Sequence, residues 1–230
     1  MISANLDHCL SFINSQSLPT TKARGVVAVR HAVTISRMAG CGAIYVAEKL
    51  ANYLESHAPT PGVKWTIFDR QLMQKVLEDH KLPTSLAKIL SEDRTSFIQD
   101  TIADIFEVHP TADKMVKLIS ETILQLASVG NVIIVGRGAN IVTAKMPHVL
   151  HVRLVAPLEE RIERVCHEYN KTPEEARHNC LEEDPARTRY IRTYFKTDIN
   201  DPVHSHLVIN TGRISYADSA RLMAEALMKL

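Results

Sequence analysis

Short apolar runs alternate with longer stretches of helical periodicity along most of this chain. The apolar runs, which predict strands, are VVAVRHAVTIS, KWTIF, NVIIVG, VLHVRLV and HLVIN. Apolar residues recur every three or four positions, which predicts helices, over residues 42–56, 70–80, 138–146, 157–169 and 215–229. Near-continuous apolar strands separated by helices are typical of a parallel sheet covered on both faces. The pattern therefore predicts an α/β fold with a five-stranded parallel sheet between two helical layers.

Two long helical excursions interrupt this alternation. Residues 70–128 show helical periodicity without a convincing strand, which predicts a helical insert over the carboxyl edge of the sheet. Residues 172–196 form a second excursion, rich in arginine, before the last predicted strand. Residues 1–24 have the pattern of a short helix followed by a linker. We predict an N-terminal extension followed by one domain at residues 25–230.

Composition and charge narrow the function classes. Of the 230 residues, 45% are hydrophobic and 23% charged, which is typical of a soluble globular protein. The net charge is +1, so no overall field attracts nucleic acid or an anionic membrane, and any basic site must be local. No segment reaches the roughly 18 continuous apolar residues of a membrane helix, and the first residues lack a signal-peptide pattern. We expect a cytoplasmic protein with small-molecule partners, and a homo-oligomer is compatible with the sequence.

Two residue types that often mark metal or redox sites form no such pattern here. The four cysteines are scattered and lack C-x-x-C spacing, so we expect free thiols in a reduced intracellular compartment. His204 and His206 form H-S-H before the last predicted strand, with no third ligand close in sequence. We predict no metal site built from protein ligands.

The stretch ISRMAGCGAIYVA, residues 35–47, joins a strand end, a glycine-bearing turn and a helix start. This is the outline of a phosphate-binding loop, whose backbone N–H groups cradle phosphates at a helix N-terminus. Yet Ala43 stands where a mononucleotide loop has lysine, and Ile44 stands where it has the Mg²⁺-binding hydroxyl. Tyr45 occupies the third glycine position of a dinucleotide fingerprint. From these residues alone a tight structural turn, a phosphate cradle and, least favoured, a dinucleotide site all stay open.

Six segments that follow one another along the chain resemble the nucleoside monophosphate kinases, and more narrowly their cytidylate kinase-like branch. The segments are ISRMAGCGAIYVAEKLANYL, FDRQLMQKVLED, IIVGRGAN, HVRLVAPLEERIERV, DPARTRYIRTYF and HLVINTGRIS. The first is similar to that branch's phosphate loop, S-R-x-x-G-x-G-x, and the fifth to its D-x-x-R-x-x-Y lid. The resemblance spans residues 31–230 and implies a three-layer P-loop kinase fold. It also implies phosphoryl transfer from ATP, with Mg²⁺, to a nucleoside monophosphate, with CMP or dCMP as the first expectation.

The resemblance also implies roles for individual residues. The expected donor-binding residues are Ser36, Gly40, Cys41, Gly42, Ala43, Arg161 and Arg164. The expected acceptor-binding residues are Asp69, Lys75, Arg137 and Asp184. The groups expected to neutralise the moving phosphoryl group are Arg37, Arg187 and Arg192. From the residues alone, most of these charged side chains are equally well explained as helix caps or as ion-paired or solvated groups.

The sequence departs from the cytidylate kinases at positions that matter for chemistry. Val135 and Gly138 stand where those kinases have aspartates that help to read the acceptor, so cytidine specificity does not follow. Because the loop has no lysine, another cation must supply its charge, and Arg37 is the first candidate and Arg187 the second. Two other functions therefore stay open: a nucleotide-binding regulatory module without turnover, and a kinase of another small-molecule acceptor.

Overall fold

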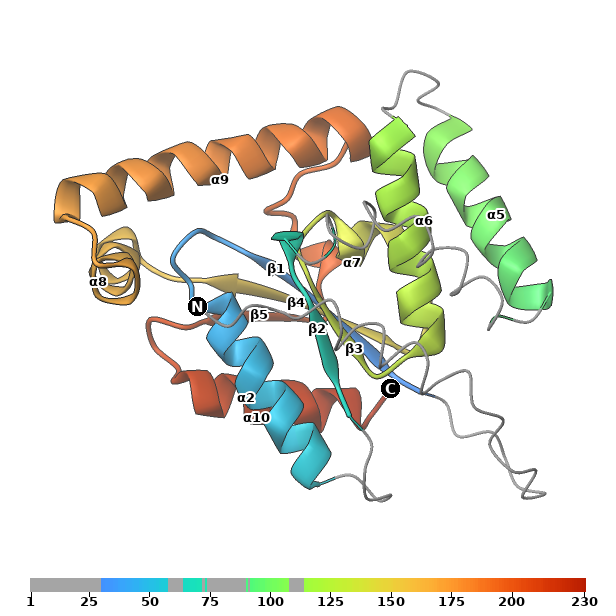
Figure 1. The fold of residues 1–230 in the computed structure, drawn as a ribbon, viewed down its shortest axis with the longest axis horizontal. Coiled ribbons are helices and arrows are strands. Elements are labelled where there is room, and N and C mark those ends of the chain that lie inside the picture. The colour runs from blue at the N-terminus through green and yellow to red at the C-terminus, as the bar shows by residue number, and fades with distance from the viewer. Residues whose placement is uncertain (1–29, 58–63, 72, 74–89, 91, 108–113) are drawn as a thin grey trace.

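The computed structural model of this chain describes residues 30–57, 64–71, 73, 90, 92–107 and 114–230. One parallel sheet runs through its centre, with the strands in the order β2-β3-β1-β4-β5 (Figure 1). The strands are β1 (Ala32–Arg37), β2 (Thr66–Phe68), β3 (Val132–Val135), β4 (Val149–Val155) and β5 (Leu207–Asn210). The central strand β1 pairs with β3 and, over its whole length, with β4. The five-stranded parallel sheet predicted from the sequence is confirmed.

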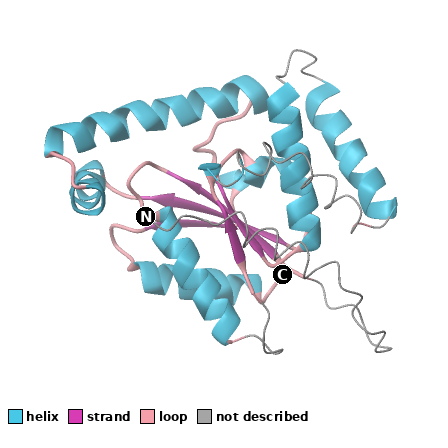
Figure 2. Ribbon diagram, in the orientation of Figure 1, coloured by secondary structure: helices cyan, strands magenta, loops and turns pink. Residues whose placement is uncertain are grey.

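Helices cover both faces of this sheet (Figure 2). On one face lie α2 (Ala43–Ser56) and α10 (Tyr216–Leu227), packed side by side. On the other lie α6 (Lys114–Val129) and the short α7 (Ala139–Val142), with α5 (Glu92–Glu107) against α6. After β4 come α8 (Leu158–Tyr169) and α9 (Pro173–Phe195), and the 3-10 turn η1 (Pro202–His204) leads into β5.

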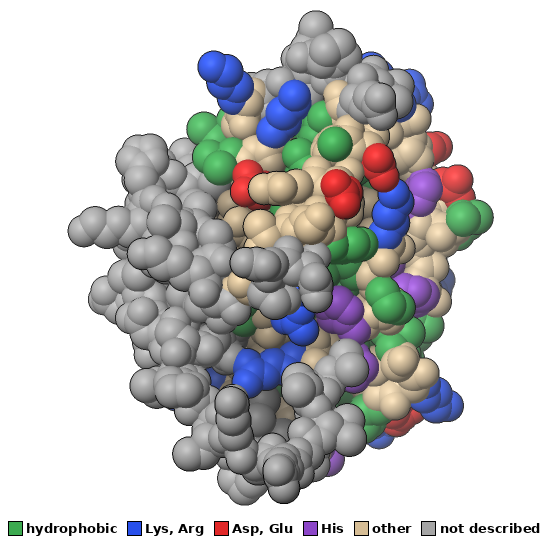
Figure 3. Space-filling model, turned by 90° about the vertical axis from the view of Figure 1, so that its right-hand side faces the viewer, with side chains coloured by type: hydrophobic (Ala, Val, Ile, Leu, Met, Phe, Trp, Pro, Cys, Tyr) green, Lys and Arg blue, Asp and Glu red, His purple; other side chains and the backbone are tan. Residues whose placement is uncertain are grey.

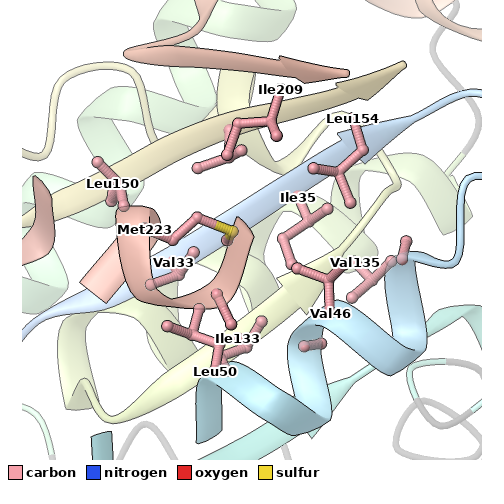
Figure 4. Packing of buried hydrophobic residues seen from close by; sticks show 14 of the residues in the cluster. Val33, Ile35, Val46, Leu50, Ile133, Val135, Leu150, Leu154, Ile209 and Met223 are labelled. Atoms are coloured by element: carbon pink, nitrogen blue, oxygen red, sulfur yellow. The ribbon is translucent and has the colours of Figure 1, made fainter. Parts of the chain in front are cut away.

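The sheet face under α2 and α10 is packed with apolar side chains along its whole length (Figure 4). Every second residue of the three central strands points to this face, as the two-residue period of a strand requires. Val46 and Leu50 of α2 and Met223 of α10 close the layer. The strand residues of the cluster include Val33, Ile35, Ile133, Val135, Leu150, Val152 and Leu154. This half of the molecule forms a rigid floor for the loops at the carboxyl edge.

The opposite face of β1 and β4 changes character along the strands. Near their start, Ala32 and Val149 pack in an apolar cluster with residues of α6 such as Ile123. Toward the carboxyl edge the same face carries buried polar side chains, namely Thr34, Ser36, His151 and Arg153. Thr34 Oγ1 lies 2.8 Å from His151 Nδ1, and burial together with His206 lowers the pKa of His151 to about 4. Polar chemistry is therefore concentrated at the carboxyl ends of the two central strands.

The helix pair α8 and α9 packs against the loop that follows β1. Ala39 of this loop joins Ile162 and Val165 of α8 and Ala176 and Cys180 of α9 in a small buried cluster. The start of α9 is fixed by a capping box. In it, Thr172 Oγ1 accepts the Glu175 N–H and the Thr172 N–H donates to the Glu175 carboxylate.

Most sequence predictions on the fold hold where the structure describes the chain. The predicted helices at residues 42–56, 157–169 and 215–229 correspond to α2, α8 and α10, and the excursion at 172–196 is the single helix α9. α6, within the predicted insert, also packs directly on the sheet as part of a covering layer. The predicted N-terminal extension, most of the helix at 70–80, and Lys75 lie outside the described residues.

The distribution of charged side chains on the surface agrees with the near-zero net charge. On the face drawn in Figure 3, acidic and basic side chains are interspersed over the described residues. No helix among the described residues combines the length and the apolar composition needed to cross a membrane.

Candidate active site

The loop between β1 and α2 turns on two glycines with left-handed backbone. Gly40 has φ +73° and Gly42 has φ +69°. A Cβ on Gly40 would lie 2.8 Å from the Arg161 carbonyl oxygen, and one on Gly42 would collide with the Tyr216 phenol. Gly42 is the N-cap of α2. Because glycine has no side chain to cap the helix, the first-turn N–H groups of α2 have no hydrogen bond from an N-cap side chain. Only glycine meets both the conformational and the steric demand.

Contacts from three other elements hold this loop. The Met38 N–H donates to the Leu154 carbonyl at 3.1 Å, which extends the β1–β4 pairing by one residue. The Cys41 carbonyl accepts from Thr211 Oγ1 at 3.2 Å, from the turn after β5. The backbone path is thus fixed without a bound ligand.

Asp184 of α9 forms the third contact, and it is a carboxylate on a loop amide. Its Oδ1 accepts the Ala39 N–H at 2.7 Å, and its Oδ2 accepts from Arg161 Nη1 at 2.6 Å. Arg161 Nη1 also donates to the Ala39 carbonyl at 3.0 Å. Arg161 is 7% exposed, so this is a buried pair that bridges α8, α9 and the loop.

Cys41 lies inside the loop and is 1% exposed. Burial raises the pKa of its thiol, with the charge of Arg161 opposing that shift only in part. A thiol held in the neutral form is a poor nucleophile. Cys41 therefore contributes its backbone and its small volume to the site.

Arg37 ends β1, and its side chain points away from the loop, toward the turn after β3. A Cβ on Gly136 would collide with its Nη1, so the guanidinium lies directly against the backbone of that glycine. Burial, with help from the charge of Arg187, lowers the pKa of Arg37 to about 10. Among the described residues, no carboxylate forms an ion pair with it. The group stays cationic near neutral pH, at the junction of β1 and β3.

Arg153 projects from β4, on the polar part of the sheet face. Its Nη1 donates to Ser36 Oγ at 2.8 Å and its Nη2 to Asn200 Oδ1 at 2.7 Å. Ser36 is its directly paired neighbour on β1. Arg153 is only 5% exposed, and burial lowers its pKa. Both hydrogen-bond partners are neutral.

A cavity of about 420 Å³ opens between the loop, β4 and α9. Arg187 of α9 borders it, donating from Nη1 to the Arg37 carbonyl at 3.3 Å and pairing through Nη2 with Glu183. The lining residues are Arg37, Met38, Arg153, Asp184, Pro185, Arg187, Thr188, Arg189, Ile199 and Asn200. The wall therefore carries four guanidinium groups and one carboxylate, which Arg161 already holds. Anionic ligands fit such a wall.

A second hollow, of about 520 Å³, lies between α8 and the start of α10. Its main polar feature is Arg164, which donates from Nη2 to the Thr211 carbonyl at 2.7 Å and from Nη1 to Thr211 Oγ1 at 3.1 Å. The Arg164 guanidinium lies 5.2 Å from the centre of the Tyr216 ring, and that ring stacks on Tyr45 at 6.0 Å. Flat aromatic and guanidinium surfaces suit a heterocyclic base.

The comparisons with known proteins decide the family. The model of the cytidylate kinase-like family matches residues 32–213, which include the loop, α9, every residue that lines the first cavity and most of those that line the second hollow. The chain belongs to the cytidylate kinase-like family. The match confirms the resemblance on which the candidate roles of Arg37, Asp184 and Arg187 were based, while the roles themselves remain predictions.

Similarity to individual proteins is more distant. A uronate isomerase of Corynebacterium glutamicum is 30% identical over 112 residues, which are 49% of this chain and 21% of that protein. The chain thus spans about a fifth of the length of this curated relative. An uncharacterized protein from Eubacterium ventriosum has a solved structure with a TM-score of 0.67 at 15% identity, covering 88% of this chain and all of that one. A shikimate kinase from Bacteroides thetaiotaomicron, at 12% identity, 88% coverage of this chain and 100% of its own, gives a TM-score of 0.48.

The other residues expected in a cytidylate kinase-like site have different surroundings. Arg137 follows β3 with φ +59°, faces the Tyr190 ring at 5.9 Å, and burial lowers its pKa. Its Nε is buried and has no hydrogen-bond partner among the described residues. Asp69 stands at the end of β2, and its charge acts on Arg37. Arg192 is exposed on α9 and is not part of either hollow.

Sequence reasoning missed Arg153, Asn200, Thr211 and Tyr216. The signal for Arg153 was an arginine inside the apolar run VLHVRLV, where an exposed charge has no place. Thr211 directly follows the last predicted strand, where a threonine is typical of an ordinary turn and gives no sign of a contact with the loop. Asn200 and Tyr216 carried no signal, because only the closed fold brings them to the cavity wall and to Gly42.

Proposed function

We propose that this chain transfers the terminal phosphoryl group of ATP to a nucleoside monophosphate, with CMP or dCMP as the first acceptors to test. The observation that carries the proposal is the guanidinium-lined cavity beside a glycine loop at the carboxyl edge of a parallel sheet. In open α/β sheets ligands bind at that edge. Membership of the cytidylate kinase-like family supports the same chemistry.

The donor would lie along the loop and the hollow next to it. First-turn N–H groups of α2 would bind the phosphates, and the left-handed backbone of Gly40 and Gly42 shapes the loop that presents them. The base would lie in the second hollow, whose wall includes Arg164 and Tyr216. Arg161 was expected from the sequence to bind the donor directly. Its guanidinium is instead hydrogen-bonded to the Ala39 carbonyl and to Asp184, so it would hold the loop in place behind the donor.

The acceptor would lie on the β3 side, where Arg37, Arg137 and Asp69 meet. A phosphate of the acceptor attacks the terminal phosphorus of the donor, the bond to the bridging oxygen breaks, and a nucleoside diphosphate and ADP result. A dianionic phosphate is already a nucleophile, so the reaction requires no general base. The guanidinium of Arg137, which faces the Tyr190 ring, would suit such a phosphate through its charge and its fork of donors.

Mg²⁺ would be held mainly by the donor phosphates, because Ile44 lacks the usual hydroxyl ligand. Mg²⁺ commonly keeps several waters and uses one or two carboxylates, so Asp69 alone would suffice as a protein ligand. The ion would neutralise charge on the phosphates during transfer. Among the described residues no group of three or more acidic, cysteine or histidine side chains is placed to bind a metal alone.

The test is a turnover assay. The purified chain is incubated with ATP, Mg²⁺ and each nucleoside monophosphate in turn, and ADP formation is followed against a control without acceptor. Turnover with CMP or dCMP supports the proposal in full. Turnover with another monophosphate keeps the reaction class and changes the acceptor.

A second candidate, a nucleotide-binding module without turnover, is favoured by Ala43 and Ile44. These two residues remove the ammonium and the hydroxyl that P-loop enzymes use on their substrate. Calorimetric binding of ATP or ADP without ADP formation from any acceptor would support it. Phosphorylation of a different small molecule, after rejection of all monophosphates, would support the third function that the sequence left open.

A further inference from the structure

Arg153 is a buried charge without a counter-charge. It is 5% exposed, and its two hydrogen bonds go to the Ser36 hydroxyl and the Asn200 amide oxygen. No carboxylate among the described residues lies within ion-pair distance of it. Taking a guanidinium out of water costs several kcal/mol, and neutral partners recover only part of that cost.

The other arginines around the cavity show that this arrangement is not imposed by the fold. Arg161 is equally buried and has Asp184 at 2.6 Å. Arg187 is more exposed and is paired with Glu183. Arg153 therefore differs from Arg161 and Arg187 in having neither solvent nor an acid to compensate its charge.

Arg153 lies close enough to the loop to supply the positive charge that the loop lacks. It borders the same cavity as Met38 of the loop and lies on the strand next to β1. Arg37, the first candidate for the missing ammonium, points instead against Gly136. Arg187, the second, shares its charge with Glu183. Arg153 borders the cavity next to the loop, and no carboxylate among the described residues pairs with its charge.

We propose that Arg153 binds a phosphoryl group in this cavity and supplies the positive charge that a lysine gives in other phosphate-binding loops. Ser36 and Asn200 fix the plane of the guanidinium, so its remaining N–H groups are oriented before the ligand arrives. The inference rests on the proposed function for the identity of the ligand, which is either the terminal phosphate of the donor or the phosphate of the acceptor.

Binding of inorganic phosphate at low salt tests the charge without any nucleotide. In calorimetric titrations, Arg153→Met should weaken phosphate binding about tenfold or more, because one charge-assisted contact is lost. Arg153→Lys should recover part of the affinity. Arg221→Met is the matched control, since Arg221 is an exposed α10 arginine paired with Asp218, and it should change the affinity less than about twofold.

Titrations with nucleotides then identify the source of the phosphoryl group. A loss in Arg153→Met that is larger for ATP than for ADP assigns it to the donor. A loss that is larger for CMP than for cytidine assigns it to the acceptor. If phosphate binding through Arg153 is found but no monophosphate is turned over, the inference stands and the proposed function fails.

Two results would overturn the inference. One is phosphate affinity of Arg153→Met within about twofold of the unmodified chain. The other is an unmodified chain that binds neither phosphate nor any of these nucleotides. Urea unfolding of each variant checks folding, and a purely structural Arg153 predicts a large loss of stability with unchanged phosphate affinity.

Discussion

The carboxyl edge of the sheet holds two sets of arginines that differ in one respect. On the α8 side, the guanidinium groups of Arg161 and Arg164 are hydrogen-bonded to other groups of the chain. Their partners are a carboxylate, backbone carbonyls and a hydroxyl. On the β1 and β4 side, Arg37 and Arg153 lie in a cavity wall without a carboxylate partner among the described residues. The first set holds the loop in shape, and the second leaves charge for a ligand.

The comparison separates stability from binding. A buried charge with its partner supports the folded state only as long as both members are present. A buried charge without a partner lowers stability until a ligand compensates it, which is a common cost of function. Substitutions in the two sets should therefore have opposite signatures.

The largest effect is expected from Arg161→Met, which leaves Asp184 without its buried cation and frees the Ala39 carbonyl. We expect the free energy of unfolding to fall by about 3–5 kcal/mol, measured by urea denaturation. Arg177→Met removes an exposed pair with Glu159 and should cost no more than about 1 kcal/mol. Equal losses in the two variants would break the comparison.

Arg37→Ala should act on turnover instead. We expect the rate of ADP formation to fall about 100-fold or more, because a cation is lost where charge develops. The free energy of unfolding should be unchanged or higher, since no ion pair is broken. A fall in turnover of less than about threefold would remove Arg37 from this role.

Acid should lower the free energy of unfolding through His151, which lies in the sheet beneath both sets of arginines. Its pKa is about 4 in the folded chain, against an ordinary value of 6.5, so below pH 6.5 the unfolded chain binds more protons. The contribution of His151 to stability should be constant above pH 6.5 and fall by roughly 3 kcal/mol in total between pH 6.5 and 4. His151→Gln should reduce this slope, and His178→Gln, at an exposed position, should leave it intact. Unchanged slopes in both variants would assign the acid sensitivity elsewhere.

Thr172→Ala should have the smallest effect on stability, and it should disturb neither set of arginines. Losing the capping box at the start of α9 should cost about 1 kcal/mol, read from thermal or urea unfolding. Phosphate affinity should stay the same, because the cavity contacts of α9 begin at Asp184, more than two turns away. A marked loss of phosphate binding would mean that the whole of α9 positions the cavity.

The apolar pattern was sufficient to predict a parallel sheet because the central strands bury runs such as VIIV and AVTIS, and the helices between the strands show a clear period. The site was only partly predictable. Asp184 and Arg187, which the resemblance to the D-x-x-R lid singled out, border the cavity, whereas Arg161 was expected at the ligand and lies behind the loop. The local sequence marks Arg153 only as an arginine inside an apolar run, whereas its pairing with Ser36 depends on the register of β1 and β4.

The contact between Asp184 and the Ala39 amide links α9 to the contents of the loop. A single N–H serves one strong acceptor at a time, so a phosphate oxygen at that amide and the carboxylate of Asp184 are mutually exclusive. Exchange of one for the other would break one of the contacts that join α9 to the loop. By thermodynamic reciprocity, whatever moves Asp184 away from this amide must then raise the affinity of the loop for anions by the same factor.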